Sequence, residues 1–151
     1  MTVLQVYYLH EDGSGGLLVD TLGDVRSVLD EIRADSFRLG VPLFSQWYVA
    51  DDDTASELGV GVWGDRAILT YGYRSTHVSV GAEVAVESTA TFAYMDVEIL
   101  LPLSGLIAFV DAAAAVVEFF ETGGRRPLGV PWRQITECGD LANGRTAAFA
   151  P

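Results

Sequence analysis

The sequence predicts an α+β fold in which two principal helices pack with one mainly antiparallel, twisted sheet. Short segments rich in β-branched and aromatic residues recur along the chain, as is typical of strands. Two longer segments, residues 21–40 and 104–123, instead place apolar residues at helical spacing. Several strands with helices at two separated positions indicate a single sheet packed against the helices.

The N-terminal segment predicts a strand, a turn and a short return strand. Residues 2–9 carry β-branched and aromatic side chains, and residues 10–16 are rich in glycine and acids. Residues 17–19 are apolar again and predict the return strand.

The first helix is predicted to begin after Thr21, because Asp24 follows three residues later as in a capping box. It is expected to end between Asp35 and Gly40. The face that should lie on the sheet consists of Leu22, Val25, Val28, Leu29 and Ile32.

The middle of the chain predicts further strands, at residues 43–49, 58–63, 67–73, 77–80, 83–86 and 89–95. Gly64 and Asp65 should form the tight turn of a hairpin, although their order is the reverse of the favoured Asp-Gly. Residues 96–101 could either extend the preceding strand or lead into the second helix.

The second helix is expected to open at Pro102, with Ser104 as a plausible N-cap. Gly123 would stop it in a left-handed conformation, and Pro127 would prevent its resumption. Residues 130–135 predict a last strand. The expected buried stripe consists of Leu106, Ile107, Val110, Ala113, Ala114, Val117 and Phe120, widened by Phe109, Val116 and Phe119.

Length and composition indicate one domain over residues 1–136 and a C-terminal tail over residues 137–151. Half of the 151 residues are hydrophobic, which excludes a disordered protein. The longest apolar stretch, residues 99–117, is interrupted by polar residues and by proline, so it predicts a buried helix rather than a membrane span. No secretion signal is visible at the start, and we expect a cytoplasmic protein.

The charge balance is strongly acidic. Twenty-one acidic residues face nine arginines and no lysine, which gives a formal net charge of −12. Such a charge repels nucleic acid and anionic lipid and attracts basic partners. An equally weighted alternative is that the acidity merely keeps an apolar-rich protein soluble.

Residue chemistry predicts no catalytic or metal site and no cofactor. His10 lies on an acidic turn, and His77 has no oriented nucleophile or oxyanion hole in its neighbourhood. Cys138 is the single cysteine, which excludes an internal disulfide and a cysteine-rich zinc site. The glycines do not form a phosphate loop, because Gly59 and Gly61 lie inside a strand. An enzyme is therefore not expected.

A run of three aspartates gives the first candidate for a binding surface. Asp51, Asp52 and Asp53 lack the spacing of an EF-hand and most often such a run is a solvated loop, but it could also be a negative patch for a basic partner. The solvated loop is the preferred interpretation, and the nearby Trp47 and Tyr48 strengthen the second one slightly, because aromatic anchors among charges are typical of interfaces. The candidate contact residues are Trp47, Tyr48, Asp51, Asp52, Asp53, Glu57 and Trp63.

A motif near the C-terminal end is similar to the signature of immunity protein family 1 of bacterial polymorphic toxin systems. The residues that carry the similarity are Glu118, Phe119, Thr122, Gly123, Arg126, Pro127, Val130 and Trp132. The first helix and the hairpin of residues 59–71 agree in order, so the similarity covers residues 3–132. Two residues, Gly124 and Arg125, stand where the family pattern has one.

The resemblance implies a small cytoplasmic protein that binds a cognate toxin of the same cell and neutralises it stoichiometrically. It implies a nucleic-acid-targeting toxin, of deaminase or nuclease type, and no catalytic residue, no direct nucleic-acid binding and no membrane. Physically the motif is expected to be scaffold, with Trp132 packed in or near the core. Arg125 and Arg126 could bind an anion, but we expect them to complement the negative end of the helix. The alternative is a small-ligand-binding or enzymatic α+β domain.

Overall fold

The computed structural model of the protein describes residues 2–8, 16–50, 52, 56–72, 76–81, 88–95 and 97–135. The helices are α1 (Leu22–Leu39) and α2 (Phe109–Glu121), with a 3₁₀ turn at Leu103–Gly105. The strands are β1 (Leu4–Tyr7), β2 (Leu17–Val19), β3 (Leu43–Val49), β4 (Leu58–Trp63), β5 (Arg66–Tyr71), β6 (His77–Ser79), β7 (Thr89–Tyr94), β8 (Val97–Pro102), β9 (Ile107–Ala108) and β10 (Trp132–Gln134).

The strands form one mainly antiparallel sheet, which confirms the predicted fold class. Its central order is β10-β6-β5-β4-β3-β1-β2, with β9 paired to β5 and β7 paired to both β3 and β8. The contact between β3 and β7 is parallel and is limited to Leu43 opposite Ala93. The predicted strand at residues 83–86 and the predicted tail at residues 137–151 lie outside the described residues.

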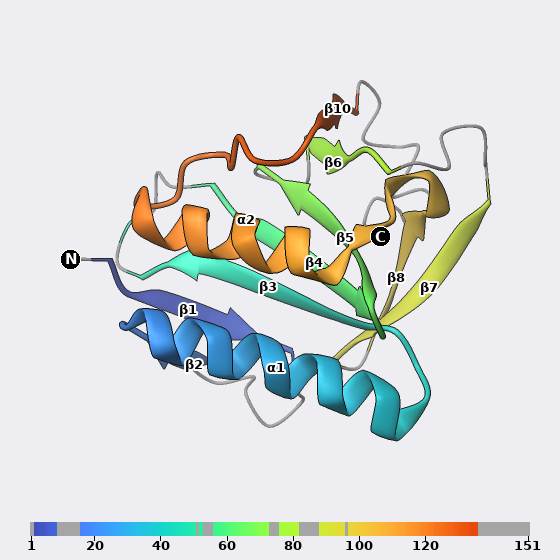
Figure 1. The fold of residues 1–151 in the computed structure, drawn as a ribbon, viewed down its shortest axis with the longest axis horizontal. Helices are drawn as coiled ribbons and strands as arrows, with labels where there is room; N and C mark the ends of the chain where they lie inside the picture. The colour runs from blue at the N-terminus through green and yellow to red at the C-terminus, as the bar shows by residue number, and fades with distance from the viewer. Residues whose placement is uncertain are drawn as a thin grey trace.

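Both helices lie side by side on one face of the sheet (Figure 1). The core between helices and sheet contains Val25, Leu29 and Ile32 of α1 and Ala112, Ala115, Val116 and Phe119 of α2. Alternate residues of the central strands meet them, because side chains along a strand point to opposite faces in turn. These strand residues include Leu4, Val6, Leu43, Trp47, Leu58, Val60, Val62, Ala67 and Leu69.

The β7–β8 hairpin covers part of the opposite face of the sheet. A second apolar cluster there joins Phe92, Ile99 and Leu101 of the hairpin to Phe44 and Ile68 of the central strands. Glycine is required under this hairpin, because a Cβ atom on Gly61 would lie 2.9 Å from both Phe92 and Leu101. Gly61 thus allows the hairpin to pack closely on β4.

The first helix begins and ends where the sequence predicts. The Thr21 side chain accepts a hydrogen bond from the Asp24 amide at 3.0 Å, which caps the first turn. Gly40 takes a left-handed conformation (φ 68°), and its amide donates to the Ser36 carbonyl at 3.0 Å.

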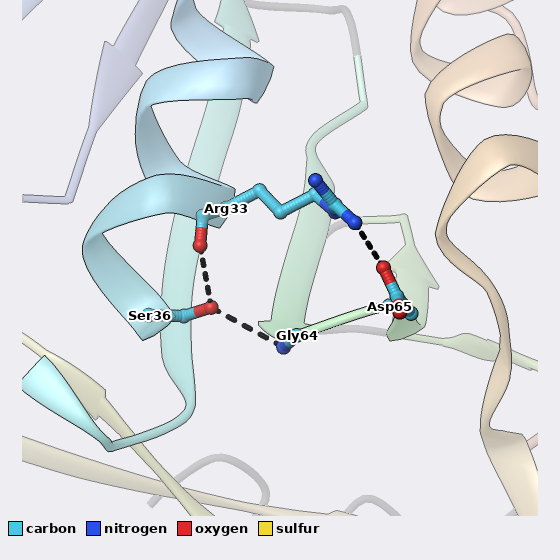
Figure 2. A network of polar contacts seen from close by, with 4 residues as sticks. All are labelled: Arg33, Ser36, Gly64 and Asp65. Carbon is cyan, nitrogen blue, oxygen red and sulfur yellow. Dashed lines mark hydrogen bonds and ion pairs between the residues drawn. The ribbon is translucent and has the colours of Figure 1, made fainter. Parts of the chain in front are cut away.

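A polar network ties α1 to the turn between β4 and β5 (Figure 2). The Arg33 guanidinium pairs with the Asp65 carboxylate, and the Gly64 amide donates to the Ser36 hydroxyl at 3.2 Å. Gly64 has a positive φ of 63°, and glycine at the first central position is the preference of type II′ turns. This preference explains the Gly-Asp order, and the predicted tight turn is confirmed.

The predicted start of the second helix is wrong, because α2 begins at Phe109 and Ser104 is not its N-cap. The preceding residues are held by the sheet instead. Ile107 and Ala108 pair with β5, and the Phe109 amide donates to the Asp65 carbonyl at 2.7 Å.

The predicted buried stripe of the second helix is also corrected. Val110 is 72% exposed and Ala114 is exposed, whereas Ala112 and Ala115 are buried. Phe109, Val116 and Phe119 are buried as expected. A helix that is apolar almost all round does not reveal from its sequence which side faces the sheet, and the small alanines allow the closest approach.

Residues 97–101 neither extend the preceding strand nor lead directly into the second helix, and residue 96 lies outside the described residues. β8 turns back at Met95, which has a left-handed φ of 54°, and pairs antiparallel with β7. The hairpin register sets Phe92 opposite Ile99, so both side chains enter the second cluster.

Candidate functional site

The structure separates the predicted contact residues. Trp47 is fully buried among the helices, and its indole N–H donates to the Ser45 hydroxyl at 2.9 Å. It is therefore a core residue and leaves the set of candidate contacts. Trp63 is 47% exposed at the end of β4. Asp52 is exposed, whereas Asp51 and Asp53 lie outside the described residues.

Tyr48 and Glu57 belong to a polar aromatic cluster on the sheet face opposite the helices. Because Trp47 and Leu58 point to the helices, their neighbours Tyr48 and Glu57 point the other way. We call this group the tyrosine cluster. All five of its members are half-buried: Tyr7, Gln46, Tyr48, Glu57 and Tyr94.

One amide oxygen holds two of the tyrosines in place. The Tyr48 hydroxyl donates to Gln46 Oε1 at 2.7 Å, and the Tyr94 hydroxyl donates to the same oxygen at 2.9 Å. Tyr7 lies opposite Gln46 in the strand register, and its ring meets the Tyr48 ring edge-on at 5.7 Å. The three rings are thus fixed by strand pairing, hydrogen bonds and edge contacts.

Burial and mutual charge set the electrostatics of the tyrosine cluster. Burial raises the pKa of Tyr94 to about 12, and the negative charge of Glu57 adds to this effect. The same two causes, in the same order, raise the pKa of Tyr48. Burial also raises the pKa of the Glu57 carboxyl. Within the described part of the chain, no hydrogen bond or ion pair reaches this carboxylate.

Sequence reasoning missed Tyr7, Gln46 and Tyr94. They come from β1, β3 and β7, and strand pairing in space brings them beside Tyr48. A signal existed for Tyr7, since alternation with the buried Val6 and Tyr8 places it on the opposite face. No such signal linked Tyr94 to it.

The C-terminal motif residues form a different kind of site, in which the hydrogen bonds run between groups of the motif and the segment that follows α2. The carboxylate of Glu118 accepts the amides of Leu128 at 2.8 Å and Gly129 at 3.2 Å. These bonds hold the segment from residue 122 to residue 131, here called the return loop, against α2.

The end of α2 is a Schellman motif, which explains the Thr-Gly-Gly sequence. The Gly124 amide donates to the Phe119 carbonyl at 2.9 Å, and the Gly123 amide donates to the Phe120 carbonyl at 3.4 Å. Both glycines have positive φ angles, 72° and 101°. The additional residue of this chain is therefore accommodated by a second glycine at a position that favours glycine.

The remaining motif residues anchor the return loop to the sheet. The Trp132 indole donates to the Pro127 carbonyl at 2.6 Å, and its half-buried ring lies 6.2 Å from that of Tyr71. Val130 is buried in the core beneath the helices. The expected packing of Trp132 near the core is confirmed.

Arg126 does not complement the helix end as predicted. Its guanidinium donates to His77 Nε2 at 2.8 Å, while the Thr122 hydroxyl donates to the Glu118 carbonyl at 2.9 Å. Burial, followed by the charge of Arg126, lowers the pKa of His77. The contact between Arg126 and His77 thus joins the return loop to β6.

A groove lies between the two helices on the other face of the sheet. It has a volume of about 430 Å³ and is lined by Arg26, Leu29, Asp30, Phe109, Val110, Ala113, Ala114 and Val117. Its wall is mostly apolar, and its two charged side chains are of opposite sign. It could receive an apolar side chain but offers few groups for recognising a polar ligand.

The described residues include no group of three or more metal-ligating side chains. Neither described helix is long and apolar enough to cross a membrane.

Comparison with known proteins identifies the family. Residues 13–134 match the family model of immunity protein Imm1, which covers α1, α2 and all strands from β2 to β10. No curated protein sequence matches the chain. The matched region contains the capped first helix, the β4–β5 hairpin and the complete return loop. The chain therefore belongs to the Imm1 family of immunity proteins.

Proposed function

We propose that this protein binds a cognate toxin that acts on nucleic acid and neutralises it by blocking the substrate groove. The observation that carries the proposal is the family match over residues 13–134. An immunity protein protects the cell that makes the toxin, so we place its action in the cytoplasm of that cell.

The charge of the chain supports a toxin of this kind. An enzyme that acts on nucleic acid presents basic residues to the phosphate backbone. A protein with a net charge of −12 complements such a groove and is steered toward it. A deaminase or nuclease domain with an open, basic groove could be blocked by a rigid acidic protein, without chemistry on either side.

A small-ligand-binding function is the second candidate, and the groove between α1 and α2 is the feature that favours it. Its volume of about 430 Å³ lies in the range of ligand pockets. Its described lining nevertheless lacks convergent polar groups, so we rank this function second.

Co-expression with the toxin encoded by the neighbouring gene tests the proposal. We expect cells that carry both proteins to grow, and the two purified proteins to elute together on gel filtration. A catalytically inactive toxin separates binding from toxicity. Equal killing with and without this protein, together with separate elution, would contradict the immunity function.

A second assay addresses the mechanism. If the protein blocks the substrate groove, an excess of a short oligonucleotide that binds the inactive toxin should compete with it. A ternary complex of toxin, oligonucleotide and this protein would instead indicate binding beside the groove.

A further inference from the structure

We propose that the tyrosine cluster is the surface that contacts the toxin, and that Glu57 receives an arginine or lysine side chain from the rim of the toxin's substrate groove. This inference rests on the proposed function and names the part of this protein that carries it out.

The rings of the tyrosine cluster are held in place before any partner binds. Tyr48 and Tyr94 are held by hydrogen bonds of 2.7 Å and 2.9 Å to Gln46, so their rings lose little freedom when a partner binds. Tyrosines are enriched among the residues that dominate binding energy, because each presents a large rigid ring and a polar tip. The cluster provides three of them on adjoining strands.

Glu57 carries a half-buried carboxyl group. A half-buried carboxylate is costly unless a cation or hydrogen-bond donors compensate it. The described residues provide neither, and the surrounding hydroxyl groups of Tyr48 and Tyr94 are already directed to Gln46. Among the described residues the Glu57 carboxylate is therefore left as an acceptor that a basic side chain from a partner can satisfy.

The same chain already holds one arginine between a carboxylate and aromatic rings. Arg33 pairs with Asp65 while its guanidinium lies 5.2 Å from the centre of the Phe37 ring and 5.4 Å from that of Phe109. A cation held at once by a carboxylate and by aromatic rings is thus an arrangement this protein already uses. The tyrosine cluster has the carboxylate and the rings, and no arginine of the described residues pairs with that carboxylate.

The groove between α1 and α2 is one competing surface. Its two charged residues, Arg26 and Asp30, are one of each sign, and Val110 and Ala114 make its outer wall apolar. It has no charge complementarity with a basic groove. We therefore assign the basic partner to the tyrosine cluster.

The test compares two substitutions that change the net charge equally. Glu57→Gln removes the proposed contact, and Glu31→Gln removes an exposed charge from the outer side of α1. We would measure association and dissociation rates of each purified variant with the inactive toxin at low and physiological salt. Far-UV circular dichroism and the thermal midpoint would verify that each variant is folded.

We expect Glu57→Gln to raise Kd about tenfold or more, mainly through faster dissociation, because truncating one partner of a buried charge pair acts on dissociation. Glu31→Gln should leave Kd within about twofold of the wild type, with any change confined to association at low salt. If the two variants bind alike while the wild type binds tightly, the inference is wrong and the immunity function stands. If the wild type itself does not bind, the proposed function fails first.

A photocrosslinking pair tests contact directly and does not depend on charge. Tyr7→p-benzoylphenylalanine places the reactive group in the tyrosine cluster, and Val110→p-benzoylphenylalanine places it in the helix groove. We expect the toxin to be captured from position 7 and not from position 110. Capture from position 110 alone would overturn the inference and assign the interface to the groove.

Discussion

Two glutamates of this protein show how differently its two polar aromatic regions are built. Glu118 lies in the C-terminal motif, and its carboxylate accepts two backbone amides of the return loop. Glu57 lies in the tyrosine cluster, and no hydrogen bond or ion pair from the described residues reaches its carboxylate. The Glu118 carboxylate is thus satisfied within the chain, whereas the Glu57 carboxylate has no such partner among the described residues.

The C-terminal motif resembles the family signature, but it is the tyrosine cluster that has the features of a contact surface. The motif is held together by hydrogen bonds to backbone carbonyls. The Thr122 hydroxyl donates to Glu118, the Trp132 indole donates to Pro127, and the Tyr71 hydroxyl donates to Gly124 at 2.7 Å. Such a network stabilises a particular return of the chain after α2. Its loss should therefore affect folding, and loss of the cluster should affect binding.

The largest expected effect is on the apolar part of the motif. Phe119→Ala should reduce the free energy of unfolding by about 3–5 kcal/mol, because the ring is fully buried and its removal leaves a cavity. Urea denaturation measures this value. Phe120→Ala is the control, because its half-buried side chain should cost clearly less. Equal losses would contradict the orientation of α2 described here.

The next effect tests the polar part of the motif. Glu118→Ala should lower the free energy of unfolding by about 1–3 kcal/mol, since two amides of the return loop lose a charged acceptor. Glu121→Ala removes an exposed acid one turn away and should change stability by less than about 0.5 kcal/mol. Toxin affinity of the folded fraction should stay unchanged in both. A selective loss of affinity in Glu118→Ala would move the interface toward the return loop.

The aspartate run tests long-range attraction separately from contact. Reversal of Asp51, Asp52 and Asp53 to lysine should slow association with the toxin by about tenfold at low salt, because steering depends on the net field. The difference should shrink at high salt, where charges are screened. Stopped-flow association at several salt concentrations measures it. Unchanged rates would place the binding face away from this run.

The smallest effect concerns stability and pH in the tyrosine cluster. The pKa of Glu57 is raised in the folded protein, so the fold favours the protonated carboxyl. This contribution to stability is fully present below the ordinary carboxyl pKa and is lost as pH rises through the raised value.

Glu57→Gln removes this dependence. At neutral pH we therefore expect a small increase in stability, and below the ordinary carboxyl pKa no gain over the wild type. Urea denaturation of both proteins across the acidic and neutral range measures the difference. A loss of stability at neutral pH would show that Glu57 already has a partner in the free protein, which would remove the basis for assigning a cation to it.

Periodicity in the sequence determined most elements of the fold. The capped start of α1, the extent of β3, the β4–β5 hairpin and the glycine stop of α2 all follow from local rules, because each depends on residues adjacent along the chain. The start and the buried side of α2 did not, since its sequence is apolar around most of its circumference. Pairing of residues 107–108 with β5 decided where that helix begins.

The candidate site shows the same division more sharply. The sequence by itself indicated the family and the acidic charge, and it placed Tyr48 and Glu57 among the candidate contact residues. Only the tertiary structure showed that Trp47 is buried and that Tyr7, Gln46 and Tyr94 lie together with Tyr48. The physical reason is that side-chain direction alternates locally, but which strands are neighbours is decided by long-range pairing and packing.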